Sequence, residues 1–378
     1  MSTATALTIV KIQRPEDRVS AEYRTQLAQL TWSAGRLHPE PTLIEVDAGD
    51  RDPPVAVPGP VLLVGPGAVL LGPRSLQAMH DALGADDGIS VPYHLGATAL
   101  AAEMPPFTRR GIERIEARFL AEDPPRAPAH GSHLPVALFH QDAWRRALDS
   151  VGAHRLLTDH EALAGVPLLA AGLCHPFIDY YGEARADVLP FLPADAADVL
   201  EIGCARGRTG RLIADHLGCR VTGVEMNPEA AADAARVLHR VVAGDVMTVE
   251  LGGRFDAIVA TELFEHLTDQ QGFLERMRAL LAPGGRLVLS VPNVGHWSIV
   301  DDLLAGRWDY LPIGLLCSTH YRFFTEATLR EWLETAGFTD LIIEAQTTEV
   351  PPRFEGLTAF EVNRQSLATS GFWVVARV

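Results

Sequence analysis

The chain has 378 residues, of which 47% are hydrophobic and 21% are charged. This globular composition excludes a disordered, collagen-like or disulfide-framework protein. The length is about 2.5 times a common domain size, so two domains are expected. Acidic residues outnumber basic residues by 48 to 32, and the formal net charge of −16 argues against a nucleic-acid partner, because phosphates would be repelled.

The four cysteines form no C-x-x-C pair, so neither a zinc knuckle nor a redox dithiol is predicted. Residues 1–11 do not combine a basic segment with an apolar one, as a secretory signal would. No apolar run approaches the roughly 18 residues of a membrane-spanning helix. These features predict reduced thiols, a cytoplasmic location and no membrane span.

Residues 1–150 alternate short apolar runs with amphipathic stretches, which predicts a first, smaller α/β domain. The pattern predicts strands at 8–10, 43–47, 61–64, 89–92 and 135–139, and helices at 21–33, 74–83 and 142–148.

Three stretches of this domain, IEVDAGD, VLLVGPGAVLLGPRSLQAM and LPVALFHQDAWRRAL, resemble parts of an A-type glycosyltransferase. The resemblance implies a nucleotide-diphospho-sugar-transferase-like fold. That family places a D-x-D motif where this chain has Gly65-Pro66-Gly67, and a tripeptide without carboxylates cannot hold the metal through side chains. We therefore expect a degenerate, non-catalytic domain used for packing, dimerisation or substrate presentation.

Residues 151–195 are predicted to form a helical bridge or lid, interrupted at prolines. Residues 196–378 form the second predicted domain. Its β-branched runs alternate with helical stretches, which favours parallel β-α units, with strands expected at 199–202, 221–224, 255–259 and 286–291.

A turn of small residues follows the first of these strands. Gly203, Ala205 and Gly207 allow backbone amides to approach a ligand where a strand enters a helix. Glu225 ends the next strand, one β-α-β unit after Glu201, where an acid can accept both hydroxyls of a ribose. A dinucleotide fingerprint fails, because Arg208 stands at its third glycine position.

Six ordered motifs resemble those of class I S-adenosylmethionine-dependent methyltransferases: VLEIGCARG, VTGVEMNP, AGDV, FDAIVATELFEHL, LAPGGRLVLSVPN and HYRFFTEATLREWLETAGF. They are most similar to the branch that includes ubiquinone-biosynthesis O-methyltransferases and many sugar and natural-product methyltransferases. The resemblance implies a Rossmann-like, seven-stranded sheet and S-adenosyl-L-methionine as cofactor. Ala205 departs from the family's usual glycine.

The resemblance also implies a role for individual residues at the cofactor. Glu201 and the turn formed by Gly203, Cys204, Ala205 and Gly207 would hold the methionine end.

Five further residues would surround the rest of the same cofactor. Glu225 would bind the ribose hydroxyls, and Met226 would lie against the adenine, with a place in the core as its alternative. Asp245 would receive the adenine amino group, with Val246 beside it. Thr261 would line the floor near the sulfonium.

A base near the methyl group would assist attack by a hydroxyl nucleophile, and His266 is the first candidate. Glu262, Glu265 and His266 are spaced i, i+3 and i+4, which predicts one face of a helix. Such a face could hold a divalent metal, with His296 or His320 as a fourth ligand. A similar E-x-x-E-H is linked to metal in some relatives. The favoured alternative is a metal-free helix start, where acids complement the macrodipole.

Residues 291–297 leave a strand at the edge where open α/β sheets bind ligands. Polar and aromatic residues in and after this segment are therefore candidates for the substrate pocket, with plain packing of the 297–322 insertion as the alternative. These candidates are Asn293, His296, Trp297, Trp308, Tyr310, His320 and Tyr321.

The combined pattern predicts a methyltransferase acting on a hydroxyl of a small molecule, such as a sugar, a glycolipid intermediate or a secondary metabolite. Three alternatives stay open: a bifunctional glycosyltransferase and methyltransferase, a metal-dependent RNA 3′-end methyltransferase, and a non-enzymatic binding protein of methyltransferase fold. A small-molecule acceptor is the expected partner, and a homodimer is an open alternative.

Overall fold

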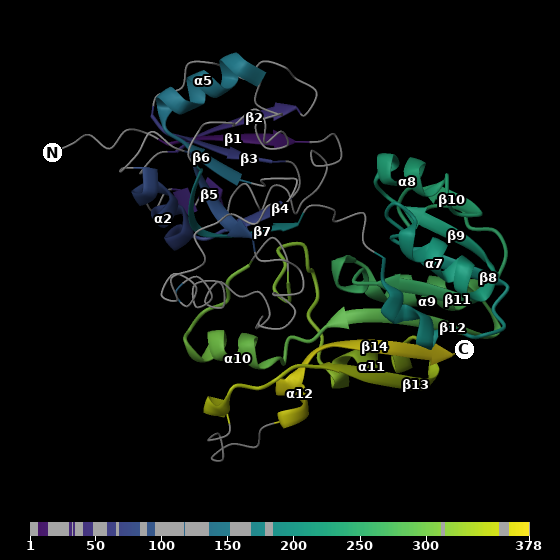
Figure 1. The fold of residues 1–378 in the computed structure, drawn as a ribbon. Coiled ribbons are helices and arrows are strands. Elements are labelled where there is room, and N and C mark those ends of the chain that lie inside the picture. The colour runs from purple at the N-terminus through teal and green to yellow at the C-terminus, as the bar shows by residue number, and fades with distance from the viewer. Residues whose placement is uncertain are drawn as a thin grey trace. The chain divides into compact units, whose positions relative to one another are not determined.

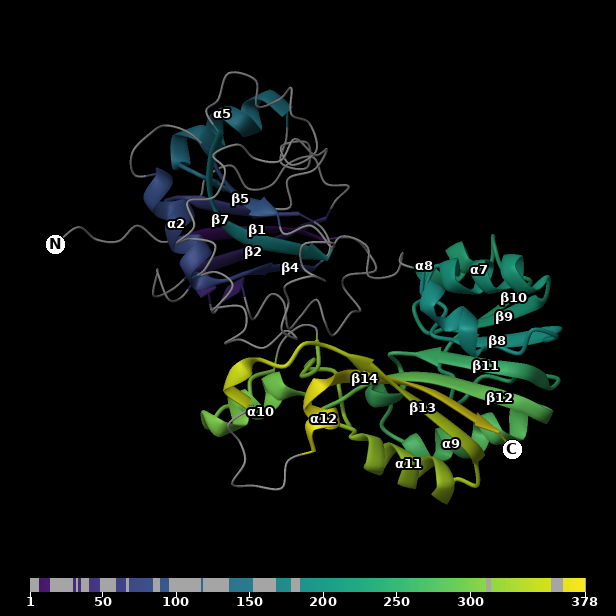
Figure 2. The same cartoon turned by 60° about the horizontal axis from the view of Figure 1, so that its bottom comes forward.

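The computed structural model describes residues 7–13, 30–31, 33–34, 41–47, 59–65, 68–83, 89–94, 117, 136–151, 168–177, 184–310, 314–354 and 363–377. The chain divides into two compact units (Figures 1 and 2). The first comprises residues 1–180 with 310–314, and the second comprises residues 181–309 with 315–378. Within the described ranges, no helix is both long enough and apolar enough to cross a bilayer.

The first unit is built on a mixed sheet that, over the described residues, has seven strands in the order β2-β1-β3-β6-β5-β7-β4. Strand β6 pairs antiparallel with β3 and β5, while β1 pairs parallel with β2 and β3. The strands are β1 (Thr8–Gln13), β2 (Thr42–Asp47), β3 (Val61–Val64), β4 (Ala68–Leu71), β5 (Ile89–His94), β6 (Val136–Phe139) and β7 (Leu168–Phe177).

Two helices of this unit, α2 (Pro73–Leu83) and α5 (Gln141–Val151), agree with the predicted helices at 74–83 and 142–148. Leu76 and Met79 of α2 pack in one cluster with Leu62 of β3 and Leu138 of β6. The expected α/β class is thus confirmed, whereas the glycosyltransferase likeness stays a prediction. Most of the predicted helix at 21–33, and Pro66-Gly67, lie outside the described residues.

The helical prediction for 151–195 is wrong over 168–177, which form strand β7 between β5 and β4. A strand inside a sheet reads as a continuous apolar run, here LLAAGLCHPF, and periodicity cannot distinguish such a run from a buried helix segment. Further along, 186–191 form a short 3-10 helix, η3 (Ala186–Phe191). The units consequently divide near residue 180 and not at 150.

The second unit contains the predicted seven-stranded sheet, in the order β10-β9-β8-β11-β12-β14-β13 over its described residues. The first five strands in that order are parallel, and β14 is antiparallel to both of its neighbours. The strands are β8 (Asp198–Ile202), β9 (Arg220–Glu225), β10 (Arg240–Ala243), β11 (Phe255–Thr261), β12 (Leu281–Pro292), β13 (Thr339–Thr347) and β14 (Thr369–Arg377).

Helices cover both faces of this sheet. Side chains cap several of them; for example, Asn227 begins α8 by accepting hydrogen bonds from the N–H groups of Glu229 and Ala230. The helices are α7 (Arg208–Leu217), α8 (Pro228–Ala234), α9 (Gln270–Leu280), α10 (Trp297–Leu304), α11 (Glu326–Thr335) and α12 (Arg364–Ala368), with the 3-10 helices η4 (Phe264–His266) and η5 (Pro352–Phe354).

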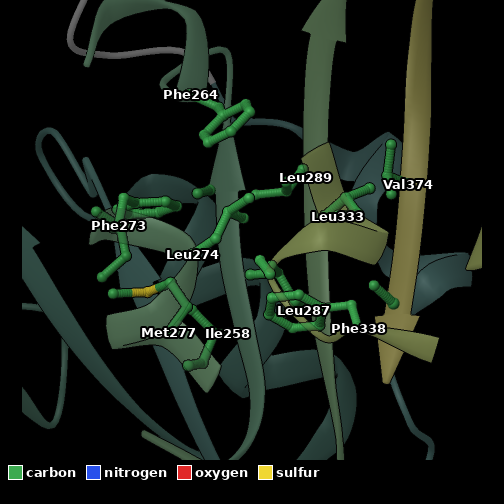
Figure 3. Packing of buried hydrophobic residues seen from close by; sticks show 14 of the residues in the cluster. Ile258, Phe264, Phe273, Leu274, Met277, Leu287, Leu289, Leu333, Phe338 and Val374 are labelled. Carbon is green, nitrogen blue, oxygen red and sulfur yellow. The ribbon is translucent and has the colours of Figure 1, made fainter. Parts of the chain in front are cut away.

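Alternate residues of the central strands enter two separate cores. Figure 3 shows one of them, in which Met277 of α9 lies near Ile258 of β11. On the other face, Val259 of β11 packs in a cluster with Ile213 of α7. Burial on both faces explains why these strands are apolar at nearly every position. It also leaves the carboxyl ends of the parallel strands as the place for polar chemistry.

Candidate active site

The turn at 203–207 joins β8 to α7 in a left-handed conformation. Gly203, Ala205 and Gly207 have φ values of 71°, 47° and 80°. The N–H groups of Gly203 and Cys204 donate to the carbonyl oxygen of Val224, at 2.8 and 3.1 Å, which ties the turn to β9. At Gly207 a Cβ atom would come within 2.9 Å of Val237, so this position has no room for a side chain.

Ala205 carries a methyl group in this left-handed conformation, which costs a non-glycine residue about 1–2 kcal/mol. Its N–H donates to Oε2 of Glu225 at 2.8 Å. The departure from glycine is therefore accommodated, and the carboxylate at the end of β9 supports the turn.

Glu225 is held at the carboxyl end of β9 by the backbone. Its Oε1 accepts from the N–H of Asn227 at 2.8 Å, and its Oε2 accepts from Ala205. Burial raises the pKa of Glu225, and these backbone donors oppose that rise. The carboxylate is thus oriented before any ligand arrives.

The neighbouring cofactor candidates lie along the same edge. Met226 is 73% exposed, which contradicts the alternative that placed it in the core. Asp245 is exposed and accepts from the N–H of Met247 at 2.8 Å, while Val246 is buried in the core beside it. Thr261 is the last residue of β11 and is partly exposed.

Glu201 lies behind the turn, in the interior. Burial raises its pKa to about 8, although the N–H of Gly210 donates to it and opposes the rise. Burial therefore favours the neutral form of this carboxyl group. Its Oε2 has no hydrogen-bond partner in the described part of the chain. This position suits a residue that supports the start of α7 from behind.

Replacement of Gly210 by alanine is expected to destabilise the protein by about 1–3 kcal/mol. In an exposed helix interior the same change stabilises by about 1 kcal/mol. Here, however, the new Cβ would collide with Oε2 of Glu201 and would lie 2.8 Å from Leu238. Urea unfolding measures the change in the free energy of unfolding between the wild type and Gly210→Ala. Gly252→Ala is the control, because no atom lies within 4 Å of its Cβ position; equal effects of the two changes would contradict the expected collision.

The E-x-x-E-H segment does not form the predicted helix. Glu262 follows β11 with a left-handed φ of 48°, and only Phe264–His266 form a single 3-10 turn, η4. The regular helix α9 begins later, where Asp269 caps it. The i, i+3, i+4 spacing implies a shared face only in a continuous helix, so the prediction of one face is wrong.

The structure groups a different set of three residues. The possible ligand atoms of Glu265, His266 and His320 all lie within 4.8 Å of one another. The imidazole rings of His266 and His320 meet edge to face at 4.7 Å, and Nε2 of His320 lies 3.9 Å from Oε1 of Glu265. Glu262 is not a member of this set, because its Oε1 accepts from Ser290 Oγ at 2.7 Å.

Two members of this set, Glu265 and His320, are buried, and the set is electrostatically costly as it stands. Glu265 is 0% exposed, and neither carboxylate oxygen has a hydrogen-bond partner in the described residues. Burial and the nearby Glu262 raise the pKa of Glu265 well above its usual value. Burial, with His266 adding to it, lowers the pKa of His320 to about 4, against an opposing hydrogen bond to Leu315. A carboxylate with two imidazoles is a donor set that suits divalent transition metals, and the unpaired oxygens of Glu265 fit such an ion.

Three of the substrate-pocket candidates are internal. Asn293 donates to the carbonyl oxygens of Ser366 and Thr369, at 2.9 and 2.7 Å. His296 caps α10, and its Nε2 lies 2.7 Å from Thr348 Oγ1. Trp297 packs against Phe354 in a buried cluster. These positions favour the packing alternative for all three.

Of the other four substrate candidates, two lie beside Glu265 and two do not. His320 joins Glu265 and His266, and the next residue, Tyr321, is 59% exposed with its N–H donating to the carbonyl oxygen of Glu265. Trp308 is exposed and contacts Phe323, whereas Tyr310 belongs to the first unit. His320 and Tyr321 thus stay next to the candidate chemistry.

The ring of His296 should make stability depend on pH. Burial lowers its pKa to about 4, whereas an unfolded imidazole has a pKa near 6.5. Between these values the unfolded state binds more protons, so the free energy of unfolding falls as the pH falls from about 6.5 to 4, by up to about 3 kcal/mol. His296→Asn retains a capping group and should reduce this loss in urea unfolding at several pH values.

The control for this prediction is His239→Asn, since His239 is exposed. If the free energy of unfolding of His296→Asn depends on pH as strongly as that of the wild type and of the control, the role given to His296 is wrong.

Arg185 lies outside every motif, and the sequence analysis missed it. Its guanidinium lies 5.1 Å from the centre of the Trp373 ring, and its Nη1 lies 3.9 Å from Oε1 of Glu262. Its N–H donates to Thr209 Oγ1 at 3.0 Å, at the start of α7. No local pattern marks such a residue, because its neighbours come from distant segments.

In the second unit, the turn at 203–207 and the carboxylate of Glu225 meet at the carboxyl edge of a seven-stranded sheet. The family model that matches this region describes the same class of protein that the motifs suggest. Residues 177–342 match the family model described as a methyltransferase domain. Residues 177–342 thus resemble a methyltransferase domain, as the motifs predict.

Its relatives include ubiquinone biosynthesis O-methyltransferases. That of Xanthomonas axonopodis pv. citri (strain 306) is 31% identical over 152 residues, which cover 37% of this chain and 62% of the relative. That of Xanthomonas oryzae pv. oryzae (strain PXO99A) is 30% identical over 167 residues, which cover 41% and 66%. The chain thus spans less than two thirds of the length of these relatives.

Among solved structures, a SAM dependent methyltransferase from Archaeoglobus fulgidus is similar, with a TM-score of 0.39 and 20% identity. That similarity covers 51% of this chain and 90% of the Archaeoglobus chain.

Proposed function

We propose that the second unit transfers a methyl group from S-adenosyl-L-methionine to a hydroxyl of a small molecule. The observation that carries the proposal is the left-handed turn at 203–207 hydrogen-bonded to the Glu225 carboxylate at the carboxyl edge of the sheet. Ligands of open α/β sheets bind at that edge. When bound, the cofactor supplies an electrophilic methyl group, so the protein has mainly to align the reactants and exclude water.

The turn and its supports suit the amino-acid end of the cofactor. The positive end of α7 attracts a carboxylate, and Arg185, whose backbone N–H is bonded to Thr209 at that end, brings a guanidinium to the same region. Glu201 supports this region from behind.

The nucleoside end fits the residues farther along the edge. Glu225 accepts the ribose hydroxyls, exposed Met226 covers the adenine, and Asp245 receives the adenine amino group beside Val246. Thr261 lines the floor. Each of these assignments follows the family motif, and the exposure of Met226 and Asp245 supports a ligand-facing role for these two.

His266 is the proposed base. It is partly exposed at the carboxyl edge, and its ring meets that of His320 edge to face. A base at this place accepts the proton that the acceptor hydroxyl loses as it attacks.

A divalent metal is a second way to use the same group of residues. Glu265, His266 and His320 would hold the ion, which would lower the pKa of the acceptor hydroxyl. Activity that survives a chelator such as EDTA would argue for the metal-free base.

The acceptor belongs to a broad class. The curated relatives are named for ubiquinone biosynthesis, and a hydroxyl on a sugar, a glycolipid intermediate or a secondary metabolite fits the same chemistry. The net charge of −16 disfavours an RNA substrate. For the first unit we propose a degenerate glycosyltransferase-like domain that presents the acceptor.

Calorimetric titration with S-adenosylhomocysteine tests the cofactor assignment, and transfer of a labelled methyl group to a panel of hydroxyl compounds tests the reaction. Binding without transfer to any acceptor would favour the non-enzymatic alternative. Turnover of nucleotide sugars by the same preparation would favour the bifunctional one.

A further inference from the structure

Glu262 is held in an unfavourable conformation at the end of β11. Its φ of 48° is left-handed, and a non-glycine residue in this region costs about 1–3 kcal/mol. The buried Ser290 of β12 fixes it: its Oγ, at 3.0 Å, and its carbonyl oxygen, at 3.1 Å, both accept from the N–H of Glu262, and the Oγ donates to Oε1 at 2.7 Å. A strained residue held this closely at a binding edge points to a purpose for its carboxylate.

The carboxylate of Glu262 lies beside Arg185, and its charge also acts on Glu265. It is 46% exposed, and its Oε1 lies 3.9 Å from Nη1 of Arg185. Ser290 pairs in register with Thr261 on one side and with Trp373 on the other. The same pair of strands therefore supplies the hydroxyl that holds Glu262 and the ring on which Arg185 rests.

Arg185 is restrained from three sides. Its guanidinium makes two hydrogen bonds of 3.0 Å to Asp187, lies over Trp373 and faces Glu262. Its backbone is fixed to Thr209, just after the turn at 203–207. Its Nε and Nη2 donate to Asp187, so a guanidinium held in this way can offer Nη1 to a carboxylate with little loss of conformational entropy.

We propose that Glu262 is a positioning residue, which orients Arg185 toward the carboxylate of the cofactor's amino-acid end, and that it is neither a metal ligand nor the base. This inference rests on the proposed function. Ser290 acts one step behind, because it fixes the carboxylate that orients the guanidinium. Together, Ser290, Glu262 and Arg185 then determine the affinity for the carboxylate of the ligand. They do not affect the contacts with its nucleoside.

The test compares two ligands by calorimetry. S-adenosylhomocysteine has the amino-acid carboxylate, and 5′-methylthioadenosine lacks it. Glu262→Gln should weaken binding of S-adenosylhomocysteine by about 3- to 10-fold and change binding of methylthioadenosine by less than about 2-fold. Ser290→Ala should act in the same direction. Glu334→Gln, an equal charge change on an exposed face of α11, should affect neither ligand.

A double variant shows whether Glu262 acts on ligand binding through Arg185 or independently of it. Arg185→Gln should weaken S-adenosylhomocysteine binding more than Glu262→Gln does, and adding Glu262→Gln to it should cause no further loss, because residues in one network are not additive. Glu262→Gly serves if Glu262→Gln folds poorly, since glycine adopts the left-handed conformation without strain.

Four outcomes would overturn the inference: equal weakening of both ligands, no weakening of either, full additivity in the double variant, or loss of Mn²⁺ binding in Glu262→Gln while S-adenosylhomocysteine still binds normally. Failure of the wild type to bind S-adenosylhomocysteine would instead refute the proposed function, and the inference with it.

Discussion

Glu225→Ala is expected to weaken binding of S-adenosylhomocysteine by about 1.5–3 kcal/mol, or roughly 10- to 150-fold. The reason is the loss of a buried carboxylate, already oriented by two backbone N–H groups, that would accept the ribose hydroxyls. Calorimetric titration measures the change.

Glu225 also supports the turn, so two further variants accompany this test. Glu225→Gln keeps an acceptor for one of the two N–H groups and should lose affinity with a smaller loss of stability. Glu331→Ala, on the exposed face of α11, controls for the removal of a charge. An unchanged dissociation constant in both Glu225 variants would remove the ribose assignment.

His266→Ala is expected to reduce methyl transfer by about 10²- to 10⁴-fold, the usual contribution of a positioned acid or base. Affinity for S-adenosylhomocysteine should change by less than about 2-fold, because the imidazole of His266 lies with Glu265 and His320 and not in the turn at 203–207 or at Glu225. Single-turnover rates with an accepted hydroxyl compound, together with calorimetry, separate the two quantities.

A matched control for this change is His239→Ala, which removes an exposed imidazole elsewhere in the same domain. If transfer in His266→Ala proceeds at the wild-type rate, the base lies elsewhere or the hydroxyl needs none. If the variant instead loses affinity for the cofactor, His266 supports binding and not proton transfer.

The sequence predicted the parts of the site that depend on short, continuous signals. The strand leading into Gly203, the small residues through Gly207 and the acid at Glu225 all lie where the pattern placed them. The cause is physical: a tight turn requires glycine, and a buried strand requires apolar residues, so both leave local marks.

What the sequence could not supply depends on contacts between distant segments. The left-handed conformation of Glu262 depends on Ser290, and it breaks the helix that the E-x-x-E-H spacing had suggested. His320 replaces Glu262 beside Glu265 because a later loop returns to this edge. The guanidinium of Arg185 lies over the ring of Trp373. These two residues come from opposite ends of the second unit's sequence.

The order of strands has a consequence for biogenesis. Strand β14 is made after every other strand of its sheet, yet it occupies a place between β12 and β13. Until residues 369–377 have emerged from the ribosome, β12 presents an unpaired edge and Asn293 lacks its acceptor at Thr369. A nascent chain is therefore open to mispairing along that edge until a late stage of translation, and chaperones that shield exposed strands would have their greatest effect at this stage.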